Sequence, residues 1–220
     1  ILSIVVFSSS GLSAEWEVPD GWKYLRFAGG SAAGSWTPLT AKVCELIDRE
    51  IPGVRASSTT GASYGNLVSL NSGNLQLAMS MSNAVYESYY GVDVRGTGKL
   101  KVTPKLRWLG SMHYGAMNVF VPKDSWIQEV EVIAEKPIRM TCGPKKSFAY
   151  FFDNLLLQTL GSSIEDLEER GGTAHKVYEG QGLTLMKDGK VDILIFHSGP
   201  PTAVVMDAAS SIGIRFLEFA

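Results

Sequence analysis

The chain has 220 residues, of which 45% are apolar and 19% are charged, and its 20 basic and 22 acidic side chains give a net charge of −2. This is the composition of a folded globular protein, and it excludes collagen-like, low-complexity and disordered chains. The near balance of charge provides no basic field for phosphates, so we expect no nucleic acid partner. The length suits one large α/β domain or two smaller lobes.

The opening residues are apolar and uncharged. Ile1 to Phe7 form a run too short for a membrane span, which needs about 20 apolar residues, and serines follow this run. We expect residues 1–14 to be part of a secretory signal peptide whose charged beginning is missing, with cleavage near Ser13 or Ala14. A buried first strand is the alternative interpretation.

The two cysteines lie in apolar patterns. Cys44 falls within a helical pattern and Cys142 ends a strand pattern. Two buried thiols are therefore favoured, while a disulfide between them stays open. Neither the cysteines nor the three histidines have the spacing of a metal site, and we expect no metal or other cofactor.

Strand and helix patterns alternate along the first part of the chain. Strands are predicted over residues 23–28, 54–58 and 75–79. Helices are predicted over residues 36–50, after residue 63 and from residue 83 toward residue 90. In the first helix the apolar residues recur at helical spacing, and Pro52 with Gly53 ends it. Three strand–loop–helix units in a row predict a parallel α/β sheet.

A surface loop is predicted over residues 91–103, and two extended segments follow it at residues 106–112 and 116–121. A second set of α/β units comes after these segments. Strands are predicted over 137–142, 173–178 and 191–196, and helices over 148–160 and 180–187. Ser162 stands three residues before Glu165, which is the spacing of a capping box at a helix start.

This order predicts two lobes. The first is expected over residues 22–121, and it includes a hinge strand at its end. The second is expected over residues 122–220. We expect the lobes to close over a ligand about the strand at residues 116–121.

Small-residue loops recur where a predicted strand runs into a helix. They lie at residues 29–35, 60–63, 80–83, 143–147 and 197–201. In open α/β sheets this edge binds ligands, and the free N–H groups of helix starts suit a carboxylate or a phosphate. Helix capping alone explains any single loop of this kind. Five of them across two lobes predict a cleft.

Several stretches of the chain carry a resemblance to a known family. In chain order they are Gly29-Gly30-Ser31-Ala32-Ala33-Gly34-Ser35-Trp36, Thr59-Thr60-Gly61-Ala62-Ser63 with Asn66-Leu67, Leu75 to Asn83, Val121-Pro122-Lys123-Asp124-Ser125, Gly143-Pro144 to Ser147, Lys187-Asp188-Gly189-Lys190-Val191-Asp192, and Gly199-Pro200-Pro201. Their order and spacing over residues 22–219 resemble those of the TAXI-type solute-binding proteins of tripartite ATP-independent periplasmic (TRAP) transporters.

The resemblance implies a two-lobed periplasmic-binding-protein (flytrap) fold of the α/β class, with a second lobe that continues past Ala220. It also implies a periplasmic protein that captures a small organic anion, often glutamate or a related dicarboxylate. The implied partners are the membrane-embedded permease subunits of a TRAP transporter. By position, the first lobe would supply Ser31, Ser35, Trp36, Thr60, Ser63, Ser82 and Asn83 to the ligand. The second lobe would supply Lys145, Ser147, His197 and Gly199.

The residues themselves leave several of these roles open. Trp36 either stacks on an apolar part of the ligand or packs in the core. Lys145 and Lys146 either pair with a carboxylate or stay solvated. His197 points either into the cleft or onto a neighbouring carbonyl, and Asn83 either meets the ligand or caps a helix.

Two other classes of protein fit an α/β chain, namely an enzyme and the ligand-sensing domain of a receptor or regulator. We expect no serine-nucleophile elbow of the GxSxG type, and the sequence holds no SxxK or GxxxxGK[ST] motif and no paired metal ligands, so catalysis is not favoured. A sensor would need a DNA-binding or membrane-spanning segment, and the sequence shows neither pattern. A non-catalytic binding protein is therefore the favoured function.

Overall fold

A computed structural model of the chain describes residue 18 and residues 20–93, 106–112, 114–145, 147–200 and 202–218. The expected signal peptide at residues 1–14 lies outside the described residues, as do most of the expected loop at 91–103 and Lys146.

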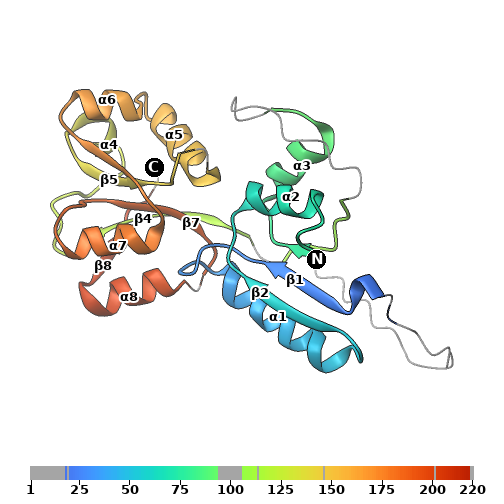
Figure 1. The fold of residues 1–220 in the computed structure, drawn as a ribbon. Coiled ribbons are helices and arrows are strands. Elements are labelled where there is room, and N and C mark those ends of the chain that lie inside the picture. Colours follow the sequence, from blue (N-terminus) through green and yellow to red (C-terminus); the bar gives the residue numbers. More distant parts are fainter. Residues whose placement is uncertain are drawn as a thin grey trace.

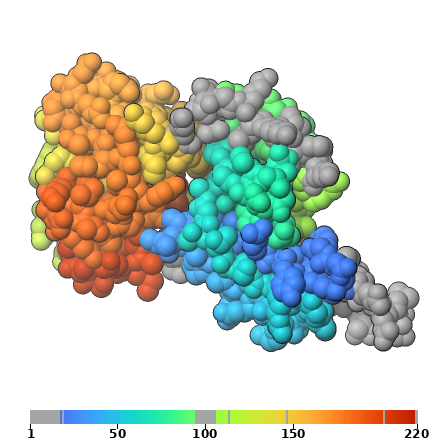
Figure 2. All heavy atoms as spheres, viewed as in Figure 1, coloured from blue at the N-terminus to red at the C-terminus, as the bar shows by residue number. Residues whose placement is uncertain are grey.

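The described residues form two α/β lobes that lie side by side (Figure 1). In the space-filling view the lobes are two masses that meet along one boundary (Figure 2). The first lobe contains η1 (Asp20–Trp22), β1 (Tyr24–Ala28), α1 (Trp36–Glu50), β2 (Arg55–Thr59), α2 (Ser63–Asn71), β3 (Leu77–Ala78) and α3 (Ser82–Tyr90). The second contains β4 (Ala116–Pro122), α4 (Val132–Glu135), β5 (Arg139–Cys142), α5 (Phe148–Thr159), α6 (Ile164–Glu169), β6 (Thr173–Lys176), α7 (Glu179–Lys187), β7 (Leu194–Ser198), α8 (Ala203–Ser211) and β8 (Ile214–Phe216).

The sheet of the first lobe is parallel, with the strand order β2-β1-β3. Burial alternates along the start of β1: Leu25 and Phe27 are buried, whereas Tyr24 and Arg26 are exposed. Helix α1 packs on β1 and β2, and α2 packs on β3 and α3. The parallel sheet and the bounds of α1 confirm what the sequence predicted for this lobe.

The strands of the second lobe run as one continuous layer. Strand β4 pairs antiparallel with β7 on one side and with β8 on the other. Strands β5 and β6 are parallel, and a bridge between Met140 and Ile193 joins them to the β7 side. The buried hydroxyl of Thr141 accepts the Ile195 N–H (2.9 Å) and donates to the Ile195 carbonyl (3.2 Å), so it links β5 to β7 where the ladder ends.

Both faces of this layer are buried, and each holds its own apolar cluster. Val119 and Val121 of β4 join the cluster under α5 and α6, whereas Phe120 joins the cluster under α7 and α8. In β7, Ile195 faces the first cluster, and Leu194 and Phe196 face the second. Because both faces are covered, the middle of each of these strands, residues 119–121 and 194–196, is apolar at consecutive positions instead of at alternate ones.

The structure differs from the sequence predictions at several places, and α4, α8 and β8 were not predicted. The expected lobe boundary at residue 121 falls inside β4, which pairs only with strands of the second lobe among the described residues. No strand forms over residues 106–112. The cap of α6 is Ser163, whose hydroxyl accepts the Asp166 N–H (3.0 Å), and not Ser162.

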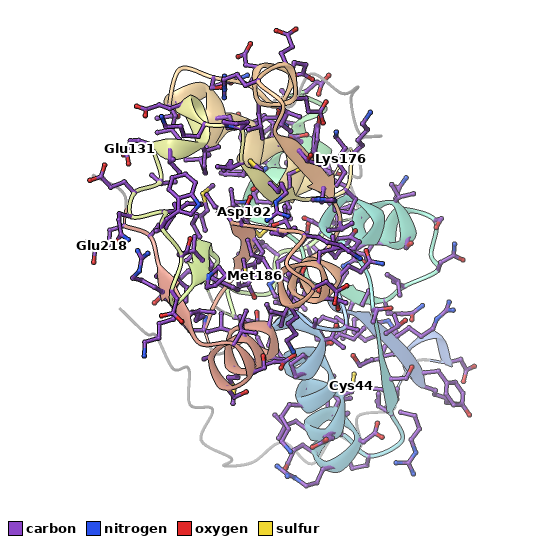
Figure 3. The ribbon with its side chains drawn as sticks, turned by 90° about the vertical axis from the view of Figure 1, so that its left-hand side faces the viewer. Cys44, Glu131, Lys176, Met186, Asp192 and Glu218 are labelled. Atoms are coloured by element: carbon purple, nitrogen blue, oxygen red, sulfur yellow. The ribbon has the colours of Figure 1, made fainter. Side chains whose placement is uncertain are left out.

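The two cysteines are buried free thiols in different lobes. Figure 3 places Cys44 in the first lobe, apart from Lys176, Met186 and Asp192 of the second. Cys142 ends β5, and burial raises the pKa of its thiol to about 12. Both side chains therefore behave as small core residues in this fold.

Candidate functional site

A cavity of about 300 Å³ lies between the two lobes. Its walls come from segments 30–36 and 61–65 and Met81 of the first lobe, and from segments 143–145, 147–149, 177–179 and 195–198 of the second. Nearly all of these segments connect a strand to the next helix, which is where ligands bind in open α/β sheets. The structure thus contains the cleft that the small-residue loops predicted.

Most of the predicted ligand residues line this cavity. They are Ser31, Ser35, Trp36, Ser63, Lys145, Ser147 and His197. Thr60 instead lines a hollow on the first lobe beside Arg26 and Asn66. Ser82, Asn83 and Gly199 are not among the residues lining the cavity. Asn83 reaches it indirectly, because its amide donates to the hydroxyl of Tyr64 (3.3 Å), which does line it.

Hydrogen bonds to the backbone hold the first-lobe loops in place. The hydroxyl of Thr37 donates to the carbonyls of Gly30 (3.0 Å) and Ser31 (2.9 Å). The side chain of Asn66, which is buried, donates to the carbonyls of Gly29 and Met79, both at 2.8 Å. These bonds join three loops of one lobe into a single rigid wall.

No Gly-x-Ser-x-Gly elbow was expected from the sequence, and this expectation is wrong as to the motif, because Ser63 stands at the centre of such a stretch, Gly61 to Gly65. In α/β hydrolases this spacing places a serine nucleophile on a strained turn between a strand and a helix. Here Ser63 is already the first helical residue of α2, and its hydroxyl accepts the Met81 N–H and lies near the Ser80 hydroxyl, both at 2.9 Å. Through these contacts, Ser63 connects the start of α2 to the loop between β3 and α3.

The second-lobe loop depends on a glycine. A side chain at Gly143 would place its Cβ 2.4 Å from the Cβ of Ala149 and 2.7 Å from the Ser147 hydroxyl, so only glycine fits. The Ser147 hydroxyl caps α5 by accepting the Tyr150 N–H (3.0 Å). The loop therefore turns tightly into the helix and brings the start of α5 to the cavity.

His197 and Asp153 form a buried pair behind this loop. Odd-numbered positions of β7 face α5, as the burial of Ile195 shows, so His197 points toward that helix. Its Nε2 atom lies 2.9 Å from Oδ1 of Asp153, whose Oδ2 accepts the Gly143 N–H at 2.8 Å. Burial raises the pKa of Asp153, although the hydrogen bonds from His197 and Gly143 oppose this shift. The pair fixes both the imidazole and the loop.

The two lobes also touch beside the cavity. The hydroxyls of Ser35 in the first lobe and Ser198 in the second lie 3.0 Å apart. The Ser31 hydroxyl donates to Glu179 at the start of α7. These contacts connect the two walls directly, so a ligand in the cavity would touch both lobes.

The sequence matches the model of a family described as NMT1-like over residues 27–220. The chain belongs to the NMT1-like family. The match covers both lobes, so it includes every segment that lines the cavity.

Solved structures of periplasmic binding proteins share the fold of this NMT1-like chain. The aliphatic sulphonate binding protein SsuA from Escherichia coli is 17% identical, with a TM-score of 0.52 over 89% of this chain and 56% of its own. SsuA from Xanthomonas axonopodis pv. citri, bound to MOPS, is 18% identical, with a TM-score of 0.54 over 89% of this chain and 60% of its own. An ancestral arginine-binding protein bound to arginine is 12% identical, with a TM-score of 0.51 over 89% of this chain and 78% of its own.

These matches confirm the periplasmic-binding-protein fold that the sequence predicted. At such low identity they establish the fold of the NMT1-like chain alone. The chain spans less than two thirds of the length of either SsuA protein.

Some residues that line the cavity of this NMT1-like chain, or hold the residues that line it, were not predicted from the sequence. Tyr178 and Glu179 line it from a junction between β6 and α7 that carries large side chains, so it escaped the small-residue pattern. Tyr64 follows the predicted Ser63, and its hydroxyl donates to the fully buried Glu87 (2.9 Å). Asp153 lies in the middle of α5, where no local signal marks it.

In the part of the NMT1-like chain that the structure describes, no three His, Cys, Asp or Glu side chains are grouped to hold a metal ion. The helices in this part lack the length and hydropathy of a membrane span.

Proposed function

We propose that this NMT1-like protein is a periplasmic solute-binding protein that captures a small organic anion between its lobes without chemical turnover. The observation that supports the proposal most strongly is the cavity itself, because strand-end loops of both lobes line it. A ligand held by both walls stabilises one arrangement of the lobes, and a membrane permease can recognise that arrangement.

The residues around the cavity favour an anion. Lys145 supplies an ammonium group, and the start of α5 adds the partial positive charge of a helix N-terminus. The hydroxyls of Ser31 and Ser35 and the imidazole of His197 add groups that can donate hydrogen bonds. The relatives named as sulphonate-binding proteins take an anion on the same fold, which supports this ligand class.

The partner we propose is the permease pair of a TRAP transporter, and glutamate or a related dicarboxylate is the ligand class implied with it. Both rest on the resemblance of the loops to TAXI-type proteins. An ABC permease is the competing partner, because one solved relative is described as the substrate binding protein of an amino acid ABC transporter. Uptake of labelled ligand into vesicles that hold one permease or the other would decide between them.

Thermal unfolding of the chain with a panel of amino acids, dicarboxylates, keto-acids and sulfonates tests the ligand class. A ligand at 100 times its Kd adds about 2.7 kcal/mol to the free energy of unfolding, which raises Tm by several degrees. A shift with a small anion, and recovery of that anion unchanged after incubation, supports the proposal. A shift only with uncharged or cationic compounds, or conversion of the bound compound, would contradict it.

A further inference from the structure

We infer that the cavity binds a carboxylate with a single negative charge and an aromatic body, in preference to a dicarboxylate. The inference rests on the proposed function: it keeps the small organic anion proposed there, and in place of the dicarboxylate implied by the TAXI resemblance it puts an aromatic monocarboxylate. It follows from two features of the lining, namely its aromatic side chains and the signs of its charges.

Aromatic side chains line the cavity from both lobes. Trp36 and Tyr64 belong to the first lobe, and Phe148 and Tyr178 belong to the second. Such walls bind apolar ligand surface through the hydrophobic effect and through ring stacking. A linear dicarboxylate offers these walls only a few methylene groups, whereas a phenyl ring fills the space between them.

The side chain of Trp36 packs at the cavity against Gly30, which lies in the same loop. A Cβ atom at Gly30 would lie 3.2 Å from the Cβ and 3.5 Å from the Cε3 of Trp36, so the indole packs against bare backbone. On the opposite wall the ring of Phe148 meets that of His197 edge to face, at 6.2 Å between centroids. The imidazole is therefore next to an aromatic surface.

The charged groups of the lining suit one carboxylate and not two. Lys145 is the one lysine or arginine among the described residues that line the cavity, and Glu179 places a carboxylate on the same lining. Lys145, Ser147 and His197 all flank the first turn of α5, where one anionic group can be held. A second carboxylate would meet Glu179 without a second cation to offset the repulsion.

Two matched pairs of compounds test this inference by isothermal titration calorimetry of the 220-residue chain. The first pair is 3-phenylpropanoate and glutarate, and the second is phenylalanine and glutamate. Within each pair a phenyl ring replaces the distal CH2–COO− group, and the rest of the molecule is unchanged. We expect the phenyl compound to have a Kd about tenfold lower in each pair. A tighter dicarboxylate in either pair would overturn the inference and leave the proposed function standing.

The variant Glu179→Gln tests the charge argument separately. Glutamine keeps an oxygen that can accept from Ser31, so the contact between the lobes is retained. The ratio of the Kd of glutarate to the Kd of 3-phenylpropanoate should fall about threefold or more in this variant, because a second carboxylate no longer meets a negative charge. An unchanged ratio would overturn the inference. No binding of any of the four compounds to a chain that unfolds cooperatively would overturn the inference, and the proposed function would fall with it only if the wider panel of anions also leaves Tm unchanged.

Discussion

The Nε2 atom of His197 lies 2.9 Å from Oδ1 of Asp153, and this contact joins β7 to α5 across the back of the cavity. The other carboxylate oxygen of Asp153 holds the N–H of Gly143, so one fully buried carboxylate positions both a cavity side chain and the loop before α5. A buried charge is retained only where such partners compensate its desolvation. The pair therefore links the stability of the second lobe to the geometry of the site.

Asp153→Asn should change how stability depends on pH. Burial raises the pKa of Asp153, so the folded chain binds a proton more tightly at this group than the unfolded chain does. Between the ordinary pKa of about 3.9 and the raised pKa, the titration of Asp153 therefore lowers the free energy of unfolding as pH rises. Asparagine does not titrate, so this contribution is absent from the variant. Urea unfolding from pH 4 to 6 should thus show the stability of the wild type, relative to the variant, falling as pH rises. A constant or rising difference would contradict this account.

Asp192→Asn should destabilise the chain at neutral pH. Arg139 donates from its guanidinium (3.0 and 2.5 Å) and from its backbone N–H (2.8 Å) to Asp192, which ties β5 to the segment before β7. Burial opposes ionisation, but these bonds and the charge of Arg139 outweigh it and lower the pKa of Asp192. The pair is partly exposed, so we expect a loss of about 1 kcal/mol.

The sign of this effect with pH is opposite to that of Asp153. A lowered pKa contributes stability above the ordinary value, and this stability is lost as pH falls through the folded value. The difference between wild type and Asp192→Asn, measured by urea unfolding, should therefore shrink below about pH 3.9. A difference that is equal at pH 7 and pH 2.5 would show that the pair does not act through its charge.

Gly143→Ala should distort the site. The new Cβ would overlap Ala149 and Ser147 at 2.4–2.7 Å, and the backbone N of Tyr150 at 2.7 Å, so the loop must move. We expect a loss of about 2 kcal/mol or more in the free energy of unfolding. Gly65→Ala is the matched control, because it lies in α2 with nothing within 4 Å of the added atom and should stabilise the helix by about 0.5–1 kcal/mol. Equal effects of the two changes would contradict the packing described.

Lys145→Met combined with Ser147→Ala should weaken binding of an anion while the fold persists. Loss of the ammonium group and of the hydroxyl at the helix start should raise Kd about tenfold. Loss of the Ser147 cap should lower the free energy of unfolding by about 1 kcal/mol. Lys187→Met is the control, because this lysine pairs with Asp207 outside the cavity, and it should leave Kd unchanged. Unchanged affinity in the double variant would remove both residues from the site.

The sequence predicts the elements of this fold well wherever the local signal is complete. Helix α1 was predicted with its observed bounds, because its apolar spacing ends at Pro52 and Gly53. At α6 the local signal is ambiguous, since Ser162 and Ser163 each stand three residues before an acidic residue. The choice between them depends on burial of Ile164 in the core, which the sequence does not specify.

The candidate site is predictable only in part for a related reason. Residues such as Ser31 and Lys145 lie in loops whose glycine and hydroxyl content marks a strand-to-helix turn. Asp153 acts through a partner 44 positions away, and Glu179 faces a serine 148 positions away. Contacts of that kind follow from how the strands are ordered and how the lobes meet, and no local pattern encodes either.

Hydrogen exchange of the backbone amides, with and without the tightest-binding of the four carboxylates, tests capture between the lobes most directly. We predict that the ligand slows exchange in segment 29–36 of the first lobe and in segment 143–149 of the second, with similar dependence on ligand concentration. Exchange in α8, which lies away from the cavity lining, should not change. Protection confined to one lobe would contradict the account, because the ligand would then not be held by both walls.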